Sequence, residues 1–422
     1  MTSHTRGTTR RQLLARSGAV GAAALTTPAW LAPTARAAAS SGPAAAPHTL
    51  VLVFLRGGMD GLSLVVPHGD GDYYAARSDL AVPPPGQPSG ALDLDGFFGL
   101  NPNAAPLLDA WGEGKLAIVH AAGSTDPTRS HFEAFTRMEF GIPELPLGSA
   151  NQGWLARHLL ATAPAFDGAP LRAISFDPVL PQTLAQAPAT LPIPDFAEFQ
   201  FPGAPATASA REAVLRAVYR GEAPPVGPAA LSTLNAIDLY SGLDLASHQP
   251  GPGVSYPDTE FGEQLKQCAA LFANDVAPEA LMLSTASWDH HSAIGPLEGI
   301  FAQMSAELAA GLAAFLADTA AFADRYTIVV KSEFGRRVAQ NGSLGLDHGH
   351  GNAMLLLGNG VAGGQVHGAW PGLAEAQLDQ GDVAITTDFR DVLGEVLVKR
   401  LGTADLGAVF PEHVYAPIGV LS

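Results

Sequence analysis

Six short runs of apolar residues divide the chain, and each is typical of a strand that is buried on both faces. The runs have few polar alternate positions, as do strands of parallel sheets, and the first of them also contains several β-branched residues. They are Thr49–Leu55, Lys115–Val119, Leu171–Phe176, Ala280–Ser284, Tyr326–Val330 and Ala353–Leu357.

Helical patterns separate several of these runs. The expected helices are His131–Phe140, Ala210–Tyr219, Phe261–Phe272, roughly Pro296–Ala323, and Thr387–Leu401 with Thr387 as a candidate N-cap. Strands that alternate with helices predict an α/β fold. We expect a central, mainly parallel sheet with helices on both faces.

The N-terminal segment has the three parts of a secretory signal. Thr9–Leu14 contains paired arginines, a short apolar run follows from Ser17 to Trp30, and Ala35–Ala39 offers small residues for cleavage. Paired arginines indicate the twin-arginine export machinery as a partner, so we expect export in folded form to the periplasm, cell envelope or extracellular space. The alternative is a basic, Ala-rich tail.

The rest of the chain is interpreted as one large domain. Residues 1–39 form the predicted signal peptide, 40–48 a linker, and 49–422 a single α/β domain with an insertion near 178–260. The insertion is rich in Pro and Ala and has no clear periodicity. No later segment is judged long and apolar enough to cross a bilayer, which takes about 20 residues, so we do not expect an integral membrane protein.

Composition excludes some partners. Removal of residues 1–39 leaves 18 basic and 40 acidic residues, a formal charge of −22. Nucleic acid and anionic membranes need a basic surface, so neither is expected to bind. The lone cysteine, Cys268, is predicted to be a small core residue.

Polar side chains gather at the predicted strand ends, where ligands bind in open parallel sheets. Five groups stand there: Arg56–Gly61 with Asp60, His120 with Ser130 and His131, Trp288–His291, Ser332–Arg337, and Asp347–Asn352. They hold six of the 13 histidines, namely His120, His131, His290, His291, His348 and His350. Imidazole and carboxylate suit zinc, manganese or iron, so we expect one or two divalent transition-metal ions.

Each group also has a simpler interpretation. Asp60 could stabilise a turn, and Ser130 could be an N-cap. Asp289 with His291 could be an exposed loop pair, and Glu333 with Arg336 could form a surface ion pair. The two histidines of Asp347–Gly351 are the hardest to explain by packing.

These motifs resemble an exported bacterial family called domain of unknown function 1501. The matching segments are Leu55–Gly61, Ser130–Ala134, Trp288–His291, Ser332–Arg336, Asp347–Asn352 and Thr387–Val392. The family is itself similar to the alkaline phosphatase and sulfatase superfamily. The resemblance implies an α/β sheet with a metal centre at its edge.

The resemblance also implies roles for individual residues. Asp60 matches the first metal ligand, Ser130 the nucleophile, and Asp289 with His291 an Asp-and-His ligand pair. Glu333 stands at an Asp ligand position, and His348 or His350 matches the last histidine, with Asp347 as an extra ligand. Phe334 replaces an expected His, which would reduce a two-metal site to one metal or require the extra histidines. His131, beside Ser130, could be the functional group instead.

Three functions follow as hypotheses. The first is a metal-dependent hydrolase of phosphate or sulfate esters, small or polymeric, in which Arg336 steadies charge on the ester oxygens. The second is a non-catalytic, metal-stabilised binding or assembly protein of the cell envelope. The third, a metal-free Ser/His/Asp hydrolase, is disfavoured because no Gly-x-Ser-x-Gly turn occurs.

Overall fold

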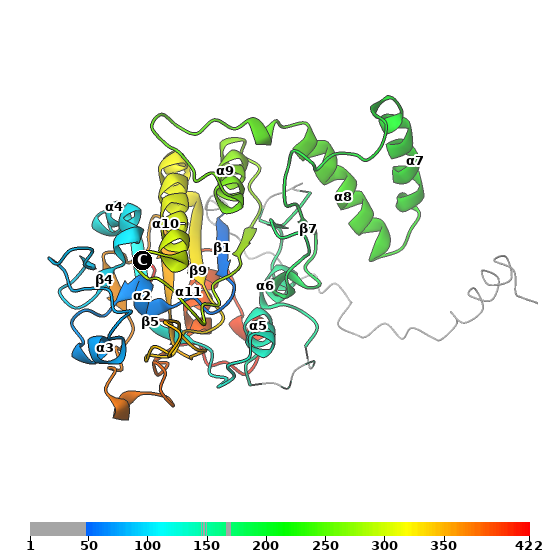
Figure 1. Cartoon of the computed structure of the whole chain (residues 1–422). Helices are drawn as coiled ribbons and strands as arrows, with labels where there is room; N and C mark the ends of the chain where they lie inside the picture. The colour runs from blue at the N-terminus through cyan, green and yellow to red at the C-terminus, as the bar shows by residue number, and fades with distance from the viewer. Residues whose placement is uncertain (1–47, 145, 147, 149, 166–169) are drawn as a thin grey trace, which may run out of the picture. The chain divides into compact units, whose positions relative to one another are not determined.

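A computed structural model describes residues 48–144, 146, 148, 150–165 and 170–422 (Figure 1). The predicted signal peptide, and the linker apart from His48, lie outside the described residues. The strands are β1 (Thr49–Leu55), β2 (Val65–Val66), β3 (Leu92–Asp93), β4 (Gly99–Leu100), β5 (Leu116–Gly123), β6 (Ala173–Ser175), β7 (Thr190–Pro192), β8 (Ala280–Thr285), β9 (Tyr326–Lys331), β10 (Asn352–Leu357), β11 (Gln365–His367) and β12 (Thr387–Asp388).

The helices are distributed along the same chain. The α-helices are α2 (Gly61–Leu64), α3 (Gly71–Ala76), α4 (Leu108–Gly112), α5 (His131–Phe140), α6 (Trp154–Ala161), α7 (Ala208–Arg220), α8 (Val226–Ser241), α9 (Glu260–Ala273), α10 (Ile300–Asp318) and α11 (Phe389–Lys399). The short 3-10 helices are η2 (Pro102–Leu107), η3 (Gln182–Leu184), η4 (Pro205–Thr207), η5 (Leu245–Ser247), η6 (Ala320–Arg325), η7 (Glu375–Gln377) and η8 (Leu406–Ala408).

The large sheet confirms the predicted mainly parallel arrangement. Its order is β11-β5-β10-β9-β1-β8-β6-β7, with β12 also paired to β5. β1 runs parallel to β8 and β9, whereas β10 is antiparallel to both of its neighbours, β5 and β9. Because β10 is reversed, the residues that precede it lie at the edge where β1, β8 and β9 end. A small sheet, β2-β4-β3, forms beside it.

Helices cover both faces of the large sheet, and β1 is therefore buried on both faces. Val51 and Val53 lie in one core cluster with residues of α4, α9 and α10, and Cys268 is part of this core. Leu50 and Leu52 lie in the other cluster with residues of α5, α6 and α11. Figure 1 shows α9 and α10 over one side of the strands.

The predicted insertion contains more helix than expected. It holds β7 and two helices, α7 and α8, which pack against each other. The predicted helix Ala210–Tyr219 corresponds to α7, whereas α8 was not predicted because it begins with Val-Gly-Pro and its apolar residues show no clear helical period. Residues 46–422 form one compact unit that includes this insertion.

Two local predictions need correction. α10 is long and apolar enough to cross a membrane by length and composition, contrary to expectation, but half of this stretch is buried inside the protein, as in a core helix. The N-cap of α11 is Asp388 rather than Thr387, since the Asp388 side chain accepts the backbone N–H of Arg390.

Candidate metal centre

Four side chains from three parts of the chain converge at this edge of the sheet. His131 is the first residue of α5, Asp289 and His291 follow β8, and His348 precedes β10. The Nε2 atoms of His131, His291 and His348 lie 3.4, 3.0 and 3.2 Å from Oδ1 of Asp289. The Nε2 atoms of His291 and His348 lie 2.9 Å apart. We call these four residues the histidine–aspartate cluster.

The ring of His131 is fixed by a buried carboxylate behind it. Its Nδ1 lies 2.6 Å from Oε1 of Glu333, and Glu333 also accepts the backbone N–H of Gly57 and the hydroxyl of Ser332. A proton on Nδ1 satisfies this contact and leaves Nε2 facing Asp289. Among the described residues, this buried Nε2 has no hydrogen-bond partner.

The other two rings are held in the same way. Nδ1 of His291 lies 3.1 Å from Oδ1 of Asp347, and Nδ1 of His348 lies 2.7 Å from the backbone oxygen of Arg129. Histidines that bind metals through one nitrogen usually donate the other N–H to a carboxylate or a backbone carbonyl. All three imidazoles therefore present the nitrogen that is left for a metal.

The spacing of the ligand atoms of His131, Asp289 and His348 fits a metal ion between them. Zinc is bound tetrahedrally by imidazole nitrogen at roughly 2.0–2.1 Å, which places neighbouring ligand atoms about 3.3 Å apart. The contacts of Asp289 Oδ1 with the three imidazoles span 3.0 to 3.4 Å. Within the described part of the chain, His131, Asp289 and His348 form the one group of three such ligand atoms within 4.8 Å of one another, and His291 lies beside this group rather than in it. Nitrogen and oxygen ligands suit zinc, manganese or iron.

A family profile covers most of the chain and includes the whole cluster. The profile of the family described as "Protein of unknown function (DUF1501)" matches residues 117–399. The chain belongs to this family. The match confirms the resemblance that the motifs predicted, and it begins after β1, so that Asp60 lies outside the matched residues.

Similar solved structures share little sequence with this DUF1501 chain. The crystal structure of Ps i-CgsB in complex with k-i-k-neocarrahexaose is 9% identical, with 86% of this chain and 74% of that chain covered and a TM-score of 0.39. The phosphonate monoester hydrolase of Agrobacterium radiobacter is 12% identical, with 76% and 70% covered and a TM-score of 0.29. The C-terminal periplasmic domain of EcEptC from Escherichia coli, in complex with Zn, is 13% identical, with 75% and 74% covered and a TM-score of 0.30. No curated protein matches the chain. At such low similarity, these structures do not decide the reaction.

Arg336 of this DUF1501 chain positions Asp289. The guanidinium is 2% exposed and donates to Oδ1 of Asp289 at 2.5 Å. Its other acceptors are the backbone oxygens of Gly57, Gly58, Trp288 and Leu346. Burial would raise the pKa of Asp289, but Arg336 outweighs it and holds the pKa below its usual range. Since its N–H groups already have acceptors, Arg336 is not placed for the predicted contact with ester oxygens.

Phe334 forms an apolar wall against the cluster. Its ring centroid lies 4.8 Å from that of His131 and 5.1 Å from that of His348. Gly58 has a φ of +67°, and a Cβ there would lie 2.6 Å from the Phe334 ring, so glycine is needed for this packing. The ring offers no ligand atom, so this side of the cluster contributes nothing to metal binding.

Asp60, the predicted first ligand, is paired within the fold. Its two oxygens accept from the guanidinium of Arg77 at 2.5 and 2.9 Å, and both side chains are buried. Burial would raise the pKa of Asp60, but Arg77 outweighs it and lowers the pKa. The structure therefore does not bring Asp60 into the cluster. Arg77, 17 residues away in sequence, was missed because no local pattern marks such a pairing.

His350 also faces elsewhere. Its Nδ1 lies 2.7 Å from Oδ2 of Asp379, and its Nε2 lies 3.0 Å from the backbone oxygens of Ser124 and Asp126. Both ring nitrogens thus face acceptors, and neither is left for a metal. Of the two histidines in the strongest predicted motif, only His348 joins the cluster.

Glu333 and Asp347 support ligands in this geometry rather than being ligands. Glu333 faces the Nδ1 side of His131, and Asp347 faces the Nδ1 side of His291. Both carboxylates were predicted as metal ligands because the family resemblance places Glu333 at an Asp ligand position and Asp347 in the motif of the last histidine. The backbone oxygen of Arg129 faces Nδ1 of His348 in the same way. It was missed because a backbone oxygen cannot be recognised from the type of its residue.

Ser130 stands at the start of α5, directly before His131. Its hydroxyl makes no capping bond, nor any other hydrogen bond within the described residues, so it is available to a substrate. Of the remaining predicted histidines, His120 is buried with Nε2 3.1 Å from the backbone oxygen of Val65. His290 is buried beside Trp288. Neither histidine belongs to the cluster.

Proposed function

We propose that this protein is a metal-dependent hydrolase of phosphate or sulfate esters. One divalent transition-metal ion would be held by His131, Asp289, His291 and His348. The observation that carries the proposal is the convergence of three Nε2 atoms on one carboxylate oxygen, with each Nδ1 held by an acceptor. Placement in the alkaline phosphatase and sulfatase superfamily is part of the proposal and rests on the motifs.

The protein's own residues would prepare the site. A bound metal ion would polarise the ester oxygen and supply a nucleophile at neutral pH. Glu333 keeps the His131 ring in one orientation, Arg336 keeps Asp289 ionised, and Phe334 excludes water from one side.

Ser130 is proposed to attack the ester or to position a water. The support is its free hydroxyl at the N-terminus of a ten-residue helix, where an anionic phosphate or sulfate group is favoured. Its backbone neighbour, His131, belongs to the cluster. Attack by the Ser130 oxygen would release the alcohol and leave the serine esterified until water hydrolyses it.

Metal analysis and turnover together test this function. The mature protein would be loaded with zinc, manganese or iron and assayed against p-nitrophenyl phosphate and p-nitrophenyl sulfate, beside Ser130→Ala. We expect about one ion per chain, turnover that a chelator abolishes, and a fall in the rate of Ser130→Ala with unchanged metal content. Activity that resists the chelator would contradict the proposal.

A metal-stabilised envelope binding protein is the second candidate. The specific observation in its favour is that Arg336, which borders the cluster, already has five acceptors within the protein. A bound metal with no turnover on either ester would support this function and count against the hydrolase.

We also propose export by the twin-arginine pathway, on the basis of Arg10 and Arg11 and the apolar run behind them. Replacement of both arginines by lysine should leave the precursor in the cytoplasm. Unchanged export of that variant would contradict the pathway.

A further inference from the structure

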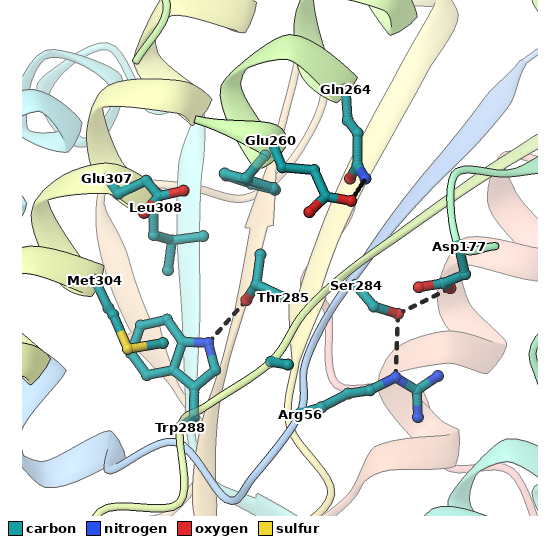
Figure 2. Close-up of a pocket in the computed structure, with 12 residues that line it drawn as sticks. Arg56, Asp177, Glu260, Gln264, Ser284, Thr285, Trp288, Met304, Glu307 and Leu308 are labelled. Carbon is teal, nitrogen blue, oxygen red and sulfur yellow. Dashed lines mark hydrogen bonds between the residues drawn. The ribbon is translucent and has the colours of Figure 1, made fainter. Parts of the chain in front are cut away.

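A pocket lies beyond the carboxyl ends of β1, β8 and β6, and its lining includes Trp288, the residue before Asp289, but no residue of the histidine–aspartate cluster. Its volume is about 350 Å³, which is within the range of small-molecule sites. Arg56 follows β1, Ser284 and Thr285 end β8, and Asp177 follows β6. Figure 2 shows these residues below α9 and beside α10. Ligands of open parallel sheets bind at such strand ends.

The polar lining of the pocket is mostly acidic. Asp177, Glu260 and Glu307 contribute three carboxylates. The one cation, Arg56, is already neutralised, since its guanidinium donates to Glu139 at 2.9 Å and to Ser284 at 3.2 Å. The pocket therefore repels anions and favours a cation.

A buried amide oxygen in the lining lacks a partner. Gln264 is 4% exposed, and among the described residues its Oε1 accepts no hydrogen bond. Its Nε2 is held by Glu260 at 3.3 Å, and Figure 2 shows both side chains extending from α9 toward Thr285. A buried acceptor without a donor is costly, so a ligand that brings N–H or O–H groups would stabilise it.

A metal ion does not fit this lining. Within the described residues, its carboxylates do not form a group of three ligand atoms close enough to share an ion. The lining also has an apolar part, which consists of Phe261, Trp288, Met304 and Leu308. An aromatic face beside carboxylates suits an organic ammonium group, through charge and cation–π attraction.

We propose that this pocket binds an organic ammonium compound, a primary amine on a compact apolar body. The ammonium would donate to Gln264 and to the carboxylates of Glu260 and Glu307, and the apolar body would lie against Trp288. The site goes beyond the proposed hydrolase and does not depend on a metal in the cluster.

Two probes that share a shape but differ in charge separate the effect of charge on binding from the effect of size. Binding of cyclohexylamine, which is protonated at pH 7, and of cyclohexanol would be measured by ligand-observed NMR on the mature protein, with a chelator present so that the amine cannot bind a metal. We expect cyclohexylammonium to bind about tenfold more tightly than cyclohexanol. Glucose would be run beside them as a neutral polyol.

Variants assign the binding to the pocket. Glu260→Gln combined with Glu307→Gln should weaken cyclohexylammonium about tenfold and change cyclohexanol less than about twofold. Glu263→Gln, which removes a charge of α9 that pairs with Lys266 outside the pocket, should change neither. The inference would be overturned by absence of ammonium binding, by equal or tighter binding of cyclohexanol or glucose, or by unchanged ammonium binding in a double variant that keeps its circular dichroism.

Discussion

Asp60 and Asp289 follow two neighbouring strands, β1 and β8, yet their surroundings are opposite. Asp60 is 1% exposed, and both of its oxygens accept from Arg77. The side chain of Asp289 is 42% exposed, and one of its oxygens faces three imidazoles. Both carboxylates accept from a buried guanidinium, Asp60 from Arg77 and Asp289 from Arg336, but only Asp289 also faces imidazoles. Neither a position after a strand nor an arginine partner therefore distinguishes a metal ligand from a structural ion pair; the facing imidazoles do.

The largest effect on stability is expected at the Asp60–Arg77 ion pair. Asp60→Asn would leave the Arg77 guanidinium buried without its counter-charge, and the free energy of unfolding should fall by about 3–5 kcal/mol. Because the folded-state pKa of Asp60 is lowered, this advantage of the wild type is present above about pH 4, near the ordinary carboxyl pKa of 3.8, and is lost as the pH falls through the folded pKa. Urea denaturation at several pH values measures it.

Exposed Asp72→Asn is the control, and its free energy of unfolding should change by less than about 0.5 kcal/mol. The metal content of Asp60→Asn shows whether Asp60 is a metal ligand. If folded Asp60→Asn lost its metal without losing stability, Asp60 would be a ligand and the contrast with Asp289 would be wrong.

Lys331 sharpens the comparison, because among the described residues its buried ammonium forms no ion pair and instead lies 4.0 Å from the centroid of the Phe54 ring. It is fully buried, its Nζ has no hydrogen-bond partner among the described residues, and burial lowers its pKa to about 7. Lys331→Met should raise the free energy of unfolding by roughly 2–4 kcal/mol below pH 7, since one pKa unit is worth about 1.4 kcal/mol.

The pH dependence of this gain has a definite sign. Between pH 7 and the unfolded-state pKa near 10.5, the unfolded chain binds the extra proton, so wild-type stability rises with pH and the gain of Lys331→Met shrinks. Denaturation at pH 6 and pH 9 measures it. A gain that is equal at both values, or a loss at pH 6, would show that the Lys331 ammonium has a favourable partner.

The smallest expected effect concerns the carboxylates behind the imidazoles. Glu333→Gln should weaken zinc binding by about 10–100-fold, because the acceptor that fixes His131 becomes neutral. Asp347→Asn is the matched variant, and it should have a smaller effect because this carboxylate is half exposed. Competition with a chromophoric chelator measures both. Equal losses would mean that burial of the carboxylate does not matter.

The sequence predicted six strands of the large sheet and most of the site's neighbourhood, but not the short strands β7, β11 and β12. All six apolar runs correspond to strands, because short, continuously apolar segments are typical of buried strands. His131, Asp289, His291 and His348 were each placed at the right edge of that sheet. The antiparallel direction of β10 was not predicted, since an apolar run carries no information about its direction.

What the sequence could not supply was the partner of each side chain. His348 and His350 are two residues apart, yet only His348 faces the cluster. The His350 ring instead contacts the backbone oxygens of Ser124 and Asp126. Arg77, which belongs to another element, forms an ion pair with Asp60. Such pairings depend on tertiary contacts and leave no periodic or local pattern.

Metal content of single-histidine variants tests the central claim most directly. Elemental analysis of the folded mature protein, reconstituted with zinc, should give about one ion per chain for the wild type. His348→Ala should lose the ion, and the matched variant His350→Ala should keep it while its circular dichroism stays that of the wild type. A folded His350→Ala that loses the ion, or a folded His348→Ala that keeps it, would contradict the histidine–aspartate cluster as the metal site.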